Sequence, residues 1–156
     1  MRASSLKQHS PEIAARQNAM GILAKASAQQ ISDVWKTLGI EPSYSVIRPA
    51  EIGLVMVRGR SGGTGAPFNL CEATVTRCVV ALEDGTTGFG QALGRDKTKV
   101  LQTALIDALW QLPAHRDSIE SKVLAPLAKS QELAEQETRA EVAATKVDFF
   151  TMVRGE

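Results

Sequence analysis

Hydrophobic residues follow a helical spacing at both ends of the chain and a strand-like pattern in the middle. Ser10-Pro11-Glu12 is typical of a helix start, because serine caps, proline suits the first helical position and an acid suits the first turn. This helix is predicted to run to about Ala26. Ser27 can cap a second helix that ends at Leu38. Residues 10–39 are therefore predicted to form a helical hairpin.

The middle of the chain, residues 43–113, is predicted to form an antiparallel sheet of about four strands and a helix packed on it. Pro49 separates the first two strands, and Asp84-Gly85 is a strong hairpin-turn signal. The second strand is an almost continuous apolar run, which is typical of a strand covered on both faces. The predicted strands are Tyr44–Ile47, Ile52–Val57, Phe68–Leu82 and Thr86–Leu93.

The packing helix is predicted to begin after an Asp96 cap and to stop at Pro113. Asp107 is expected on its polar face. The remaining residues, 114–156, are helical in pattern but more polar, with a last helix over about Gln131–Lys146. We therefore expect an exposed helical arm. The fold class is α+β, in a single domain spanning 1–156. The apolar stripe of the packing helix consists of Val100, Leu101, Ala104, Leu105, Ala108, Leu109 and Leu112.

The last ten residues form an apolar tail. Buried side chains of this kind stabilise by about 1.5–3 kcal/mol each, so a tail of this composition is expected to dock, either on its own domain or on a partner. We take its apolar residues as candidate partner contacts: Val147, Phe149, Phe150, Met152 and Val153.

Composition narrows the function classes. The chain has 156 residues, 44% of them hydrophobic, and a net charge of +1. These values are typical of a globular domain with no general attraction to nucleic acid or membrane. No apolar run is long enough to span a membrane, and the first ten residues lack the apolar block of a signal peptide. We therefore expect a cytoplasmic protein.

The sequence contains few residues suited to metal binding or to acid–base catalysis. Cys71 and Cys78 are the only cysteines, and on one strand they would face opposite sides, so both are expected to be free thiols. The two histidines have no ligand-like spacing. We expect no metal and no cofactor bound by this chain, and a self-contained acid–base enzyme is disfavoured.

A glycine-rich segment with two arginines is the strongest candidate for anion contact. Glycines let successive backbone N–H groups converge on an anion, and arginine adds charge and paired donors. A plain hairpin loop explains the same residues. The candidates in this segment are Arg58, Arg60, Gly62, Gly63 and Gly65.

Further cations precede and open the packing helix. Arg95, Lys97 and Lys99 surround its N-terminus, where they oppose the helix dipole unless an anion lies nearby; a solvated charged turn is the alternative. Arg77 lies in a strand expected to be partly buried. An ion pair with an acid such as Glu72 is favoured for it over a substrate contact.

Several blocks together resemble one family, the G subunit of the bacterial carbon–phosphorus lyase core complex, over nearly the whole chain. One departure is Cys71, where the family leads us to expect glycine after the loop. The resemblance assigns no catalytic residue. The blocks are residues 48–55 (RPAEIGLV), 62–68 (GGTGAPF), 73–77 (ATVTR), 94–97 (GRDK), 104–109 (ALIDAL) and the tail 147–155.

The resemblance implies a subunit of a multisubunit transferase in phosphonate catabolism. It implies H, I and J subunits as partners, with the I subunit as main contact, and an accessory ATP-binding-cassette-type subunit. The implied step joins a phosphonate such as methylphosphonate to C1 of the ribose of ATP and releases adenine, so ATP is a substrate of the complex. A later radical step on the J subunit, with S-adenosylmethionine and an iron–sulfur cluster, breaks the carbon–phosphorus bond.

Two other functions stay open at this point. One is an independent anion-binding enzyme that uses the glycine-rich loop with Arg58 and Arg60. The other is a DNA-binding regulator that uses the N-terminal hairpin as a helix-turn-helix. The second helix, Ala28–Leu38, has Lys36 as its one cation, which is poor for phosphate contact.

Overall fold

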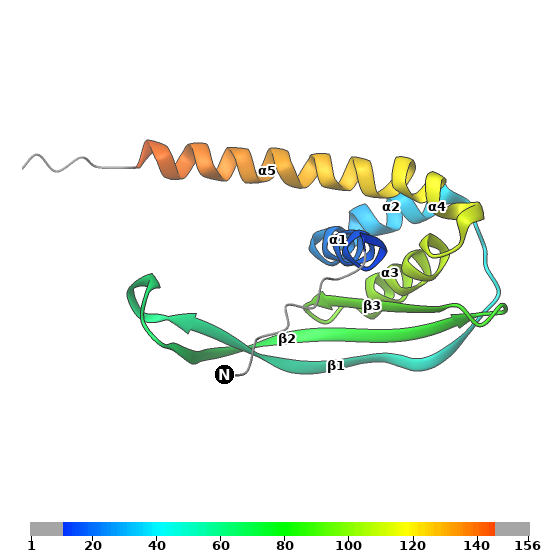
Figure 1. The fold of residues 1–156 in the computed structure, drawn as a ribbon, viewed down its shortest axis with the longest axis horizontal. Coiled ribbons are helices and arrows are strands. Elements are labelled where there is room, and N and C mark those ends of the chain that lie inside the picture. The colour runs from blue at the N-terminus through cyan, green and yellow to red at the C-terminus, as the bar shows by residue number, and fades with distance from the viewer. Residues whose placement is uncertain (1–10, 146–156) are drawn as a thin grey trace, which may run out of the picture.

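The computed structural model describes residues 11–145 and shows helices on one side of a three-stranded antiparallel sheet (Figure 1). The α+β class predicted from the sequence is confirmed. The strands follow the order β1-β2-β3 across the sheet. The elements are α1 (Pro11–Lys25), α2 (Ala28–Leu38), β1 (Tyr44–Arg60), the 3₁₀ turn η1 (Ser61–Gly63), β2 (Pro67–Leu82), β3 (Thr87–Leu93), α3 (Lys97–Trp110), α4 (Pro113–Ile119), the π-helical turn η2 (Glu120–Leu124) and α5 (Ala125–Ala144).

The N-terminal helices begin and end close to the predicted residues. Ser27 forms a capping box at the start of α2: its hydroxyl accepts from the Gln30 amide, and its own amide donates to the Gln30 side chain. Gly39 ends α2 in the left-handed conformation, with a φ of 59°. Each helix packs on α3 more than on the other helix, so α3 is the centre of the helical layer.

The sheet has three strands where about four were expected, because Pro49 lies inside β1 and does not end it. The pairing of β1 with β2 is irregular between Val46 and Glu51, on either side of Arg48. Proline lacks a backbone N–H and is tolerated on edge strands and at bulges. β1 is an edge strand, so the two predicted segments continue as one strand of 17 residues.

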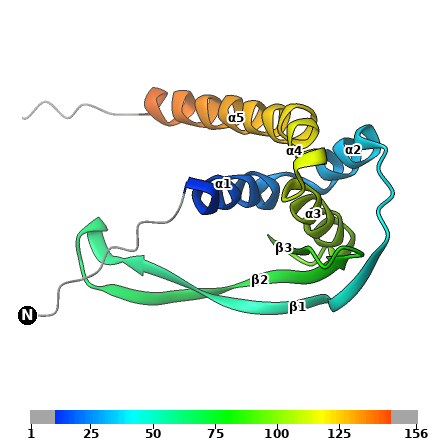
Figure 2. The ribbon, with the colours of Figure 1, turned by 45° about the vertical axis from the view of Figure 1, so that its right-hand side comes forward.

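β1 and β2 extend well beyond β3, which pairs only with Val75–Ala81 of β2. Residues 54–60 and 67–74 therefore form a two-stranded extension, here called the distal ribbon, which projects past the helices (Figures 1 and 2). The prediction that Ile52–Val57 is covered on both faces is wrong for this chain. The side chains of Ile52, Leu54 and Met56 are about half exposed or more, because no helix lies over that part of the sheet.

Close packing of α3 on β3 depends on two glycines. A Cβ atom at Gly88 would collide with the Ala104 carbonyl oxygen, and one at Gly90 would collide with the Val100 carbonyl oxygen. The missing side chains let the helix backbone approach the strand closely. The core forms around this contact and includes Val80 of β2, which is fully buried.

Asp107 of α3 is buried, with its side chain 1% exposed, and the prediction of a polar-face position is wrong. Its carboxylate accepts two bonds from Arg16 of α1, at 3.0 and 2.7 Å, and one from the Phe89 amide of β3, at 2.9 Å. The bond to Asp107 raises the pKa of the Arg16 guanidinium, although burial opposes the shift. Because the Phe89 amide points at α3, these contacts cover the edge of β3 that has no strand partner.

The C-terminal segment is partly core and partly arm. Ile119, Val123, Leu124 and Leu127 are buried, so the expectation that everything after residue 113 is exposed is wrong for this stretch. Their spacing of three and four residues places them on one helical face. Beyond Gln131, α5 is exposed to its end and forms the predicted arm. None of the helices within residues 11–145 is long and apolar enough to cross a membrane.

Replacing Gly90 by alanine is predicted to destabilise the fold by about 1–3 kcal/mol or more, since overpacking at a rigid backbone contact forces the helix off the strand. Gly21→Ala is the control, because no atom lies within 4 Å of the added Cβ in the middle of α1. It should stabilise by about 0.5–1 kcal/mol. Urea unfolding followed by circular dichroism measures both. Equal stability of the two variants would contradict the close packing.

Candidate functional site

The glycine-rich loop lies at the tip of the distal ribbon. Gly62 and Gly63 have φ values of 60° and 79°, which favour glycine. The Gly65 amide donates to the Ser61 carbonyl at 2.9 Å, and Arg60 Nη1 donates to the Gly65 carbonyl at 3.2 Å. The Gly65 amide and the Arg60 guanidinium, which were expected to face an anion, therefore form hydrogen bonds within the loop. Arg58 and Arg60 are exposed.

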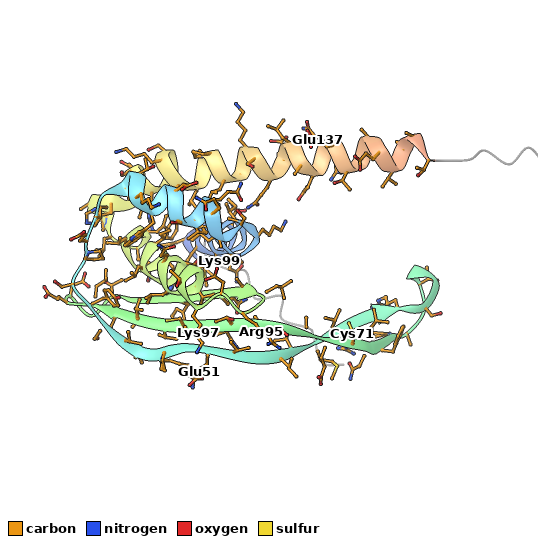
Figure 3. The ribbon with its side chains drawn as sticks, turned by 180° about the vertical axis from the view of Figure 1, so that it is seen from behind. Glu51, Cys71, Arg95, Lys97, Lys99 and Glu137 are labelled. Atoms are coloured by element: carbon orange, nitrogen blue, oxygen red, sulfur yellow. The ribbon has the colours of Figure 1, made fainter. Side chains whose placement is uncertain are left out.

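The predicted cationic candidates do not form one site. Arg95 and Lys97 are exposed at the start of α3, near the middle of the sheet, whereas Cys71 marks the ribbon that carries the loop farther out (Figure 3). Lys99 is 9% exposed, and its Nζ donates to the Ala24 carbonyl at the end of α1, at 3.1 Å. Burial lowers the pKa of Lys99, and Asp96 partly opposes the shift. Lys99 therefore belongs to the α1–α3 contact.

Arg77 is exposed, and the predicted ion pair with Glu72 is absent from the part of the chain that the structure describes. Residues five apart in a strand point to opposite faces, so the two side chains lie on different sides of the sheet. In the pairing register Arg77 lies between Glu51 of β1 and Gln91 of β3. Its guanidinium lies beside Gly53, 3.6 Å from where a Cβ atom would be.

A cavity of about 590 Å³ lies beside the sheet, next to Arg77. Two smaller cavities of about 280 and 170 Å³ adjoin it, since Gln91 lines all three. Gln91 was not predicted from the sequence, because an isolated glutamine in a strand carries no motif. The one signal that could have indicated Gln91 is its position opposite Arg77 in the β2–β3 hairpin. The large cavity is lined by Ala24, Lys25, Val55, Val75, Arg77, Gln91, Ala92, Leu93 and Lys99.

Both faces of the distal ribbon carry apolar side chains that are uncovered in this structure. Leu54 and Met56 alternate along β1 and lie on one face. The register shifts by one residue after Val57, and a Cβ atom at Gly59 would lie 3.7 Å from Leu70 and Phe68, so these two side chains lie on the opposite face. These four side chains are 45–61% exposed. A two-stranded ribbon is at best marginally stable in water by itself. An apolar patch of this kind marks an interaction surface.

The α5 arm projects in the same general direction as the ribbon (Figures 1 and 2). It carries exposed Leu133 and Val142 among charged residues. Few contacts hold the arm beyond Gln131, whose side chain donates to the Ile22 carbonyl at 2.8 Å, and the Lys25–Glu135 ion pair is exposed and 3.6 Å long. The predicted tail contacts at Val147, Phe149, Phe150, Met152 and Val153 lie outside the described residues.

Residues 11–145 contain few side-chain arrangements that are typical of a catalytic site. No group of three or more His, Cys, Asp or Glu side chains that could hold a metal ion occurs there. Cys71 and Cys78 are both free thiols, as predicted. No non-glycine residue in this range has a positive φ, so cysteine at position 71 causes no backbone strain. Cys78 is buried, and burial raises the pKa of its thiol, which opposes a nucleophilic role.

An α+β domain with a bare apolar ribbon and a projecting arm is typical of a subunit of a larger assembly. Residues 14–155 match the family of the phosphonate metabolism protein PhnG, and the chain belongs to that family. One relative comes from Rhizobium meliloti (strain 1021) and is named alpha-D-ribose 1-methylphosphonate 5-triphosphate synthase subunit PhnG. It is 45% identical over 144 residues, which cover 92% of each chain.

The two thiols provide a natural probe of this arrangement. Cys71 is exposed on the ribbon, whereas Cys78 is buried and its Sγ lies 3.4 Å from the Arg48 carbonyl. In the native chain a thiol reagent is predicted to modify Cys71 at least about tenfold faster than Cys78, because attack needs access and thiolate. Cys71→Ser should remove the fast phase. A fast phase that persists in this variant would contradict the placement.

Proposed function

We propose that the chain is a subunit of a ribose 1-methylphosphonate 5-triphosphate synthase in organic phosphonate catabolism. Membership of the PhnG family and the name of the Rhizobium relative support this proposal. The structural observation that carries it is the uncovered apolar surface on both faces of the distal ribbon, with Leu54 60% and Leu70 61% exposed. A surface of this kind is stable when another protein covers it.

The proposed partners are the H, I and J subunits of the carbon–phosphorus lyase core, with the I subunit as the main contact, and an accessory ATP-binding-cassette-type subunit. The proposed reaction joins methylphosphonate to C1 of the ribose of ATP and releases adenine. ATP is then a substrate of the assembly, and this chain binds no resident cofactor. The proposed location is the cytoplasm.

Within this assembly the chain has a supporting role. Residues 11–145 show no activated nucleophile and no metal-type cluster, which fits a subunit that completes an active site carried mainly by its partners. A self-contained enzyme built on the glycine-rich loop is the weaker alternative, because Arg60 and the Gly65 amide are engaged within that loop. A DNA-binding role has even less support, since Lys36 is the one cation of α2.

Co-expression with the other core subunits tests the proposal. A Leu54→Ser, Leu70→Ser double variant is predicted to lose most of its co-purification on size-exclusion chromatography, while its own stability stays within about 0.5 kcal/mol because both side chains are exposed. Ile47→Ser is the matched control, since Ile47 is an exposed residue of β1, 58% exposed, outside the ribbon. Truncation before Val147 tests the tail separately.

The outcomes separate the alternatives. Loss of assembly in the ribbon variant alone supports the ribbon as the anchor, and loss in the truncated chain supports the tail as a second one. Full assembly of both altered chains would contradict the proposed docking surfaces. Failure of the unaltered chain to assemble, combined with turnover of ATP and methylphosphonate by the chain alone, would favour the self-contained enzyme.

A further inference from the structure

We propose that the cavity beside Arg77 is a binding site for a small organic anion that carries a phosphate or phosphonate group. Three cationic residues line it, Lys25, Arg77 and Lys99, and no acidic residue does; Lys25 also forms the exposed ion pair with Glu135 at 3.6 Å. The cations come from α1, β2 and α3, so the fold brings together groups that are far apart in sequence. A cavity with this excess of positive charge favours an anionic ligand.

Arg77 is the group best placed to recognise the anion. No hydrogen bond or ion pair to another described residue engages its guanidinium. Arginine presents donors in a planar fork that matches two oxygens of a phosphate or phosphonate. Glu51 pairs with Arg77 in the register, so the two side chains lie on the same face of the sheet, but no ion pair joins them.

Lys99 supplies a second charge from a nearly buried position. One donor of its ammonium is used on the Ala24 carbonyl, which leaves further N–H donors on the same nitrogen. Asp96, the nearest acid along the chain, uses its carboxylate to cap α3 through the Lys99 amide, at 2.8 Å. No ion pair among the described residues engages the Lys99 ammonium, although the charge of Asp96 partly offsets the effect of burial on the Lys99 pKa.

The rest of the wall suits the uncharged body of the ligand. Val55, Val75 and Leu93 provide apolar surface, and the Gln91 amide can donate or accept beside Arg77. A volume of about 590 Å³ lies within the usual range for small-molecule sites, about 300–1,000 Å³. The space is large enough for a sugar phosphate or a nucleotide and far larger than inorganic phosphate needs.

The site belongs to this chain alone, so anion binding does not depend on the proposed assembly. Identifying the anion with a phosphonate or triphosphate of the synthase reaction does rest on the proposed function. Binding and assembly can therefore fail separately. A chain that binds the anion but does not assemble would support the site and count against the subunit role.

Isothermal titration of the full chain with methylphosphonate, tripolyphosphate and ATP, each separately, tests the site. Arg77→Gln is expected to weaken binding of the preferred anion by about tenfold or more, because it removes a bidentate charged contact. Lys36→Gln is the charge-matched control, since Lys36 is exposed on α2 and lines none of the three cavities; it should change affinity less than twofold. Arg58→Gln tests the loop at the ribbon tip.

Three results would overturn the proposal. These are no saturable binding of any of the three anions, equal weakening by Arg77→Gln and Lys36→Gln, and a larger loss for Arg58→Gln than for Arg77→Gln. Thermal unfolding of each variant shows that a loss of binding is not a loss of fold. Among the anions, preference for methylphosphonate indicates a site for the phosphonate group, and preference for tripolyphosphate or ATP indicates a site for the triphosphate group.

Discussion

The buried carboxylate of Asp107 joins three elements that are distant in sequence. It lies on α3, accepts two bonds from Arg16 of α1, and accepts the Phe89 amide of β3. Removing one partner of a buried charge pair typically destabilises by about 3–5 kcal/mol, and the partial exposure of Arg16 reduces that figure here. The position of α1 relative to the sheet, and with it one wall of the Arg77 cavity, depends on this contact.

The same contact makes the two edges of the sheet different. At β3 the free edge is covered, because Asp107 and Arg16 bind its backbone groups. At β1 the outer edge runs for 17 residues with no strand paired to it among residues 11–145. Exposed strand edges invite pairing with other chains. The chain therefore keeps its helices and small-molecule cavity at one edge, and leaves the ribbon and the other edge available to a partner.

Local signals predicted local structure well. The Ser27 and Asp96 caps, the turn at Asp84-Gly85 and the change from strand to helix spacing all correspond to observed elements. Contacts between distant residues were harder to predict. Asp107 looked like a surface residue because its partner, Arg16, is 91 positions away. From the sequence we expected an ion pair between Arg77 and Glu72, which lies nearby on the same strand. The neighbours of Arg77 across the sheet are instead Glu51 and Gln91.

The misjudged segments have a common physical cause. An apolar run in a sequence predicts that its surface is buried. It does not show whether the same chain or a partner chain covers that surface. Residues 52–57 are apolar on both faces, yet no helix of this chain covers them, whereas the more polar stretch around Ile119 and Val123 supplies core. A strand whose composition predicts burial, and which its own domain leaves exposed, points to a cover supplied by another subunit.

Hydrogen–deuterium exchange of the distal ribbon, in the isolated chain and in the assembled complex, tests that claim most directly. The account predicts rapid exchange at residues 54–60 and 67–74 in the isolated chain and strong protection in the complex, with α3 and β3 protected in both states. Equal exchange of the ribbon in the two states would show that no partner covers it, and would contradict the central claim.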